Sequence, residues 1–112
     1  MHLTRHADAV PYQAPLHDNV DTRRMQGLEA GPSDAFWVGI SQYPPGSSAG
    51  PGEVMAETVY VVLDGELTLE CEGTHVLGTH DSVRFVAGEH RRLVNASDAN
   101  ATLLVCIAKP QA

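Results

Sequence analysis

Residues 44–67 read PPGSSAGPGEVMAETVYVVLDGEL and residues 80–95 read HDSVRFVAGEHRRLVN, and these two stretches decide the fold. The first contains a β-branched and aromatic run at 58–63, followed by Asp-Gly, which is typical of a strand that enters a hairpin turn. From Leu67 onward, apolar residues alternate with polar ones. That period of two predicts another strand with one buried and one solvent-exposed face.

The rest of the chain shows further short strands and no amphipathic helix. A turn composition at 29–34 and a loop composition at 44–52, rich in Pro, Gly and Ser, separate some of them. We expect residues 1–22 to form a polar arm or early edge strand and residues 23–112 to form one domain. The expected strands lie near 23–28, 36–43, 74–77, 82–86, 91–95 and 102–108. This pattern predicts an all-β sandwich or barrel, and by itself leaves jelly roll, immunoglobulin-like and lipocalin-like arrangements open.

The composition limits the classes of molecule that this chain is expected to bind. The 112 residues contain 14 acidic and 7 basic side chains, for a net charge of −7. This balance argues against a nucleic acid or an anionic membrane as the main partner, although a local arginine can still bind a small anion. No apolar run is long enough to cross a bilayer, and the N-terminus lacks the apolar core of a signal peptide, so a cytoplasmic protein is expected. No serine-hydrolase, phosphate-loop or dinucleotide motif occurs.

The two quoted stretches resemble the two cupin motifs. VYVVLDGEL and GEHRRLVN are the specific parts, and with the strands between them they cover about the last two-thirds of the chain. The resemblance implies a double-stranded β-helix, also called a jelly roll or cupin barrel, with a small-molecule pocket at one end. It also implies a homodimer in which the N-terminal arm crosses to the neighbour. The alternation of Phe36, Trp37 and Val38 agrees with a barrel wall that has one exposed or partner-covered apolar face.

Carried over residue by residue, the resemblance implies that the usual metal ligands are missing. The first motif is anchored on Gly65, and the second on Gly88 and Asn95. The four ligand positions then fall on Gly52, Val54, Thr58 and Arg91, or on Pro51 and Glu53 for the first pair if the loop has one extra residue. Cupin metal sites need imidazole and carboxylate ligands, and an arginine there would repel the metal. We therefore expect a degenerate metal site and no metal cofactor.

Three residues adjoin these positions and are candidate catalytic residues: Glu53, Glu57 and His90. A one-residue bulge would turn them inward, where they would act in acid–base chemistry or as displaced metal ligands. Strand parity opposes this for two of them. If Thr58 and Arg91 face the pocket, Glu57 and His90 point outward, because side chains alternate along a strand.

Four more residues are candidates for ligand binding: Thr58, Tyr60, Arg91 and Tyr43. Arg91 would hold a carboxylate or phosphate by a bidentate contact, or else pair with surface glutamates. The two tyrosines would line the pocket mouth or pack in the core. The other histidines, at positions 2, 6, 17, 75 and 80, show no ligand spacing and are given no role.

Three functions remain open at this point. The first is a metal-independent isomerase, cyclase or lyase that acts on a small polar or aromatic metabolite, with a glutamate as base, His90 or Tyr60 as acid and Arg91 as anion clamp. The second is a binding or sensing protein without chemistry. The third is a metal-dependent dioxygenase or isomerase that uses displaced ligands. Fold alone does not choose among them.

Overall fold

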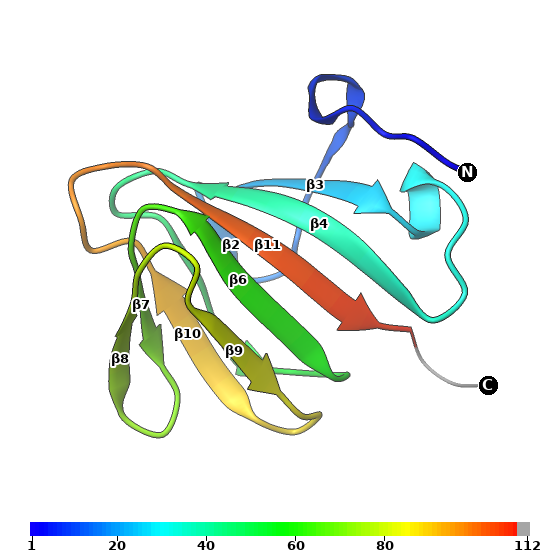
Figure 1. Ribbon diagram of the computed structural model, residues 1–112. Helices are drawn as coiled ribbons and strands as arrows, with labels where there is room; N and C mark the ends of the chain where they lie inside the picture. Colours follow the sequence, from blue (N-terminus) through cyan, green and yellow to red (C-terminus); the bar gives the residue numbers. More distant parts are fainter. Residues whose placement is uncertain (110–112) are drawn as a thin grey trace.

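Short strands arranged in two antiparallel sheets make up nearly all of the structure, a computed structural model that describes residues 1–109 (Figure 1). One sheet has the order β1-β3-β4-β11-β6-β9 and the other has the order β2-β5-β10-β7-β8. The elements are η1 (His6–Asp8), β1 (Pro11–Tyr12), β2 (His17–Asp18), β3 (Asp21–Gln26), η2 (Leu28–Ala30), β4 (Phe36–Tyr43), β5 (Ser48–Glu53), β6 (Thr58–Asp64), β7 (Leu67–Glu70), β8 (Thr74–Leu77), β9 (Ser82–Phe85), β10 (His90–Val94) and β11 (Ala101–Ala108). None of the described chain forms a helix long and apolar enough to span a membrane.

The core lies between the two sheets and follows the expected alternation. On β6, Thr58, Tyr60 and Val62 are buried, while the residues between them face outward. The inward residues of β7, β10 and β11 complete the core from both sides. Leu67, Leu69, Leu93, Leu103 and Val105 are the main contributors. The all-β, jelly-roll expectation is thereby confirmed.

Residues 44–52 do not form the long surface loop that their composition predicted. Only the first part of this segment is a turn, because residues 48–53 form β5, which pairs with β2 on one side and β10 on the other. The register between β5 and β10 shifts opposite the segment 91–93, which leaves one extra residue on β5 beside Pro51. A bulge is one of the few places where a sheet accepts a proline, so ladder pairing prevails over composition here.

The buried side chain of Asn95 forms the hydrogen bonds that hold the loop between β10 and β11. Its side chain is fully buried, and its amide nitrogen donates to the carbonyls of Tyr43 at 2.7 Å and Ala99 at 2.8 Å. Its side-chain oxygen accepts from the backbone and hydroxyl of Ser97. A buried amide with every polar atom paired stabilises one loop conformation. The asparagine of the second motif is therefore a structural residue.

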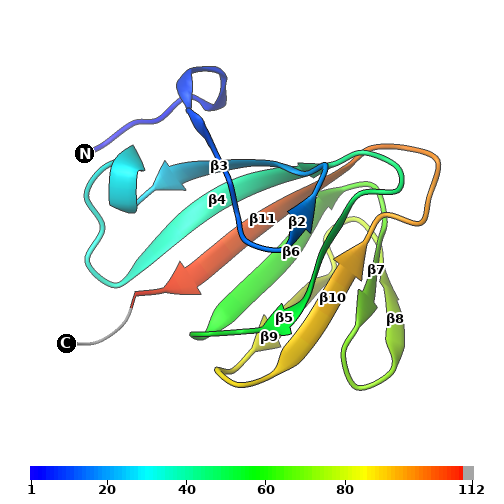
Figure 2. The same cartoon turned by 180° about the vertical axis from the view of Figure 1, so that it is seen from behind.

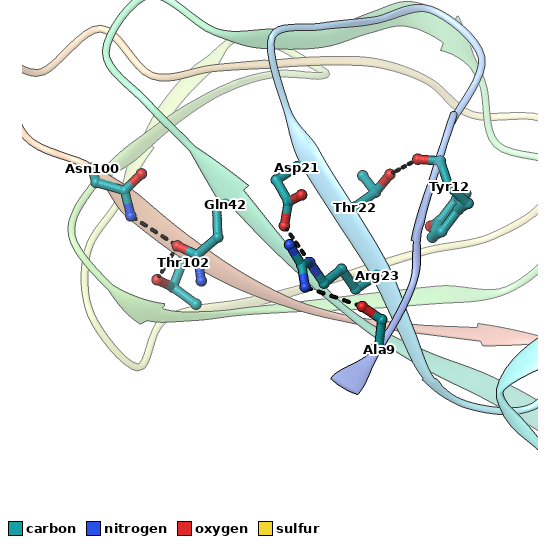
Figure 3. A network of polar contacts seen from close by, with 8 residues as sticks. All are labelled: Ala9, Tyr12, Asp21, Thr22, Arg23, Gln42, Asn100 and Thr102. Carbon is teal, nitrogen blue, oxygen red and sulfur yellow. Dashed lines mark hydrogen bonds and ion pairs between the residues drawn. The ribbon is translucent and has the colours of Figure 1, made fainter. Parts of the chain in front are cut away.

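The N-terminal arm runs from the edge of β3 across to β2 beside β5, so it joins the two sheets (Figure 2). Polar contacts tie it to β3, as Figure 3 shows. The buried hydroxyl of Thr22 donates to the carbonyl of Tyr12 at 2.5 Å, and Nη1 of Arg23 donates to the carbonyl of Ala9 at 3.0 Å. The arm thus packs on its own barrel.

The middle of the outer face of the six-stranded sheet is apolar. Val38 and Ile40 of β4 and Leu104 and Cys106 of β11 are half-buried there, whereas Trp37 points to the inner side. The expected homodimer stays a prediction.

The hairpin turn at Gly65 offers a test of how tightly the barrel ends are packed. Gly65 has φ +85°, and a Cβ there would lie 2.7 Å from the carbonyl oxygen of Asn100 and 2.9 Å from Cα of Ala101. Gly88 has a similar φ of +97° with no atom within 4 Å of the same position. We expect Gly88→Ala to lower the unfolding free energy by about 1–2 kcal/mol, the cost of left-handed backbone. Gly65→Ala should cost about 3 kcal/mol or more, because backbone atoms must also move.

Denaturant unfolding followed by tryptophan fluorescence measures both variants under the same conditions. Equal losses for the two would contradict the close packing of the Gly65 turn against the start of β11.

Candidate functional site

A cavity of about 410 Å³ opens between the sheets at the end that the arm crosses. Residues of β3, β4, β5, β6, β10 and β11 line it, and residues 12–17 of the arm form one wall. Its size falls in the range of roughly 300–1,000 Å³ that is usual for small-molecule sites. Most of its surface is apolar, with a few polar groups converging on it, which is the usual composition of such sites.

Arg91 and Tyr60 form the polar centre of the cavity. Nε of Arg91 on β10 donates to the hydroxyl of Tyr60 on β6 at 3.0 Å, so the contact joins the two sheets. Within residues 1–109, Arg91 has no carboxylate at ion-pair distance, whereas its neighbour Arg92 pairs with Glu70 on the outside. A half-buried guanidinium without a carboxylate retains donors for an anionic or hydroxyl-rich ligand.

The absence of a side chain at Gly50 lets Arg91 occupy its position in the cavity wall. Gly50 has φ +89°, and a Cβ there would lie 2.6 Å from the carbonyl oxygen of Arg91 and 3.1 Å from its Nη1. Only glycine fits this close approach of β5 to β10. The Pro-Gly-rich composition of β5 therefore has a role in building the site.

An aromatic wall lies on the opposite sheet. The guanidinium carbon of Arg24 is 3.7 Å from the ring centroid of Tyr12 and 4.6 Å from that of Trp37. The two rings meet edge to face at 6.3 Å, and Nη1 of Arg24 pairs with Glu29 at 2.7 Å. These cation–π contacts and the ion pair hold the rings in place, so they form a rigid apolar surface along the cavity.

Tyr43 adds a hydroxyl group. The side chain is 1% exposed and lines the cavity, and burial raises the pKa of its phenol above the usual value of 10.0. The phenol is therefore neutral at physiological pH and can donate a hydrogen bond to a ligand.

The structure separates the three candidate catalytic residues. Glu53 lies at the rim and lines the cavity. Glu57 is outside and pairs with Arg84 of β9, with 2.5 Å between Oε2 and Nε. His90 is exposed opposite Glu53 in the β5–β10 register and does not line the cavity. Glu57 and His90 occupy the outward parity of their strands, so we leave both out of the proposed site. Glu53 is exposed and shares the face of its register partner His90, so it meets the cavity only at its edge.

The four candidate ligand-binding residues all line the cavity: Tyr43, Thr58, Tyr60 and Arg91. Thr58 is 3% exposed, and its hydroxyl donates to the carbonyl of Ala56 at 2.9 Å. This bond orients the threonine towards its own backbone, so Thr58 shapes the wall. The other three present polar atoms to the cavity.

His17 also lines the cavity, although no role is predicted for it from the sequence. It lies on β2 in the arm, and its Nδ1 is 2.8 Å from the carbonyl oxygen of Pro15. Burial lowers the pKa of His17 below its usual 6.5, the bond to Pro15 opposes this in part, and the charge of Arg91 reinforces it. No spacing along the chain signals this residue, because its position depends on how the arm folds back over the barrel.

The positions that would carry metal ligands do meet at the cavity, yet their side chains do not fit a metal. Gly52, Val54, Thr58 and Arg91 all line it, and they offer one hydroxyl and one cation in place of imidazoles and a carboxylate. Among residues 1–109, no group of three or more His, Cys, Asp and Glu side chains is placed to hold a metal ion.

Comparison with known proteins agrees with this architecture. The family model described as "Cupin domain" matches residues 39–107, which span β4 to β11 and most of the cavity lining. A protein named beta-D-galactosidase Rv1717 from Mycobacterium tuberculosis is 50% identical over 113 residues, covering 100% of this chain and 97% of that protein.

Solved structures with a similar fold include the following two. The polyketide cyclase RemF from Streptomyces resistomycificus has a TM-score of 0.84 at 18% identity, with 96% of this chain and 79% of that one covered. A sugar phosphate isomerase from Silicibacter pomeroyi has a TM-score of 0.73 at 25% identity, with 97% and 70% covered. Both support the barrel fold.

The proximity of Arg91 to His17 can be tested by titration. We expect the imidazole of His17 to titrate below pH 6.5. Replacement of Arg91 by Gln removes a positive charge and should raise the pKa of His17. Arg92→Gln, which changes a residue facing outward, should leave that pKa unchanged. NMR of the imidazole resonances against pH measures all three proteins, and an unaltered or lowered pKa in Arg91→Gln would contradict the arrangement.

Proposed function

The chain belongs to the cupin family, and from this premise we propose that it is a metal-independent enzyme that cleaves a small β-galactoside by acid–base chemistry in the cavity between the sheets. The observation that carries the proposal is the pairing of Arg91 with Tyr60 inside a largely apolar, aromatic-walled cavity. The 50% identical relative named as a galactosidase suggests the substrate class.

The cavity suits a sugar ring. A hexopyranose has an apolar C–H face and a rim of hydroxyl groups. The rings of Tyr12 and Trp37 offer apolar surface for that face, and Arg91, Tyr43 and Tyr60 offer donors for the hydroxyls. These two kinds of contact fix a ligand's orientation as well as its position.

Tyr60 is the proton donor in this proposal. Its oxygen accepts the hydrogen bond from Nε of Arg91, so its own hydrogen is available to the leaving oxygen of the substrate. The adjacent guanidinium stabilises the phenolate that forms when the proton leaves. The positive charge of Arg91 thus acts in the transition state, where it lowers the barrier most.

Glu53 supplies the negative charge. In glycoside cleavage, positive charge develops on the sugar ring as the bond to the leaving group breaks. We assign this role to Glu53, an exposed residue at the cavity edge, because within the described residues it is the only acidic residue of the cavity lining. This gives Glu53 an electrostatic role and requires no proton on it.

A second candidate function is binding without turnover, and one observation favours it. Glycosidases usually place two carboxylates beside the bond that they cleave. In the part of the chain that the structure describes, this cavity has one. A sugar-binding protein needs only the aromatic wall and the hydroxyl donors. Binding of galactose with no hydrolysis of any galactoside would support this second function.

The role of Tyr60 predicts a dependence on the leaving group. Tyr60→Phe should lower kcat on phenyl β-D-galactoside about 100-fold, the typical contribution of a general acid. The loss on p-nitrophenyl β-D-galactoside should be much smaller, because nitrophenolate leaves without a proton. Product release is followed by absorbance, with protein purified from a host that lacks its own β-galactosidase.

Two arginine variants serve as a matched pair for this assay. Arg91→Gln should lower kcat as Tyr60→Phe does, whereas Arg92→Gln, which loses only the outer contact to Glu70, should keep the original rate. Equal losses of Tyr60→Phe on both substrates would contradict a proton-donating role for Tyr60.

A further inference from the structure

The proposed reaction leaves one task without a residue, which is the activation of the attacking water. A water molecule that adds to the sugar must lose a proton, and a base within hydrogen-bond reach accelerates that step. Among the described residues that line the cavity, His17 on β2 of the arm is the one histidine.

The hydrogen bond of His17 decides which of its nitrogens is free. A carbonyl oxygen only accepts, so Nδ1 carries the hydrogen and donates it to the Pro15 carbonyl at 2.8 Å. Nε2 is then the nitrogen with the lone pair in the neutral ring. Within residues 1–109 it has no hydrogen-bond partner, and the side chain is half-buried along the cavity wall.

The arm holds His17 in a defined position beside β5. His17 pairs with Ala49, and the backbone N–H of Gly50 donates to the carbonyl of Leu16 at 2.9 Å. The side chain of Leu16 covers Gly52, where a Cβ would lie 3.0 Å from Leu16 Cδ1. Strand pairing and this contact together hold the arm against β5.

His17 and Glu53 reach the cavity at different points of β5. Glu53 lies four residues beyond the partner of His17, which is roughly 13 Å along the strand. The two groups that would act on opposite sides of the cleaved bond are His17 and Tyr60, and both belong to the lining of this cavity.

We propose that His17 is the general base of the reaction, with Nε2 taking the proton from the water that attacks the sugar. This inference rests on the proposed function and completes it. His17 is then a catalytic residue supplied by the N-terminal arm, and the site is incomplete without residues 12–17.

The step balances as a hydrolysis. The water oxygen forms a bond to the anomeric carbon while one of its protons moves to Nε2 of His17. The bond from that carbon to the leaving oxygen breaks, and the leaving oxygen takes the hydroxyl proton of Tyr60. The proton on His17 then returns through solvent to the Tyr60 phenolate, so the net change is the addition of one water molecule with inversion at the anomeric carbon.

The groups around His17 set the pH range in which it works. Arg91 of β10 and Arg24 of β3 contribute positive charge, and Glu53 of β5 and the adjacent Asp18 contribute negative charge. Three tyrosines also line the cavity, Tyr12, Tyr43 and Tyr60. The base must be unprotonated, and its pKa lies below 6.5, so activity should be full at neutral pH and fall as the pH drops through that pKa.

The test combines a rate, a pH profile and chemical rescue. His17→Gln should lower kcat on p-nitrophenyl β-D-galactoside about 100-fold and remove the acidic limb of the pH profile. Added imidazole should restore part of the rate to His17→Ala and leave the original protein unaffected. His75→Gln is the matched control, because His75 is an exposed histidine on β8 outside this cavity, and it should keep the original rate and profile.

The outcomes separate this inference from the proposed function. If the unaltered protein hydrolyses no galactoside, the proposed function fails and the base assignment fails with it. If the unaltered protein is active and His17→Gln keeps both its rate and its acidic limb, only the base assignment fails. Proton NMR of the first product formed gives an independent reading, since release of β-galactose would show retention and contradict direct attack by water.

Discussion

Side-chain alternation along β6 and β10 is the constraint on which the rest of the site depends. It places Tyr60 on the inner side of one sheet and Arg91 on the inner side of the other, where their contact spans the cavity. The same alternation turns Glu57 and His90 outward, towards an ion pair with Arg84 and towards solvent. A shift of either strand by one residue would exchange these sets and produce a different protein.

Arg91, a cation without a carboxylate partner among the described residues, is the main charged group that this cavity offers to a ligand. Enclosed cations are costly unless they are paired, so Arg91 depends on the Tyr60 hydroxyl and on whatever enters the cavity. Arg24 differs, since two aromatic rings and Glu29 contact its guanidinium within the protein, although its buried Nε has no hydrogen-bond partner among the described residues. One arginine is therefore available to a ligand, while the other stiffens the wall against which the ligand packs.

The sequence predicts the barrel and the inner face of its strands, because both follow from the period-two pattern and the two motifs. It misses β5, because Pro51 and its neighbouring glycines have the composition of a loop. In the structure, a bulge opposite β10 allows this segment to pair as a strand. It also misses His17. That residue reaches the cavity through two short strand pairings of the arm, which carry too few residues to leave a pattern. Motif spacing predicts that Arg91 and Glu53 lie near the pocket, and strand parity predicts the same for Tyr60, and all three belong to the lining of the cavity.

The central claim is that this cavity acts on a galactoside without a metal. The most direct measurement is the rate of phenyl β-D-galactoside hydrolysis by protein that has been stripped with chelator, with its metal content measured on the same sample. We expect the rate to persist in metal-free protein and to be unchanged by added iron, manganese, nickel or zinc. Loss of the rate on stripping, with recovery at one equivalent of a single metal, would contradict the account.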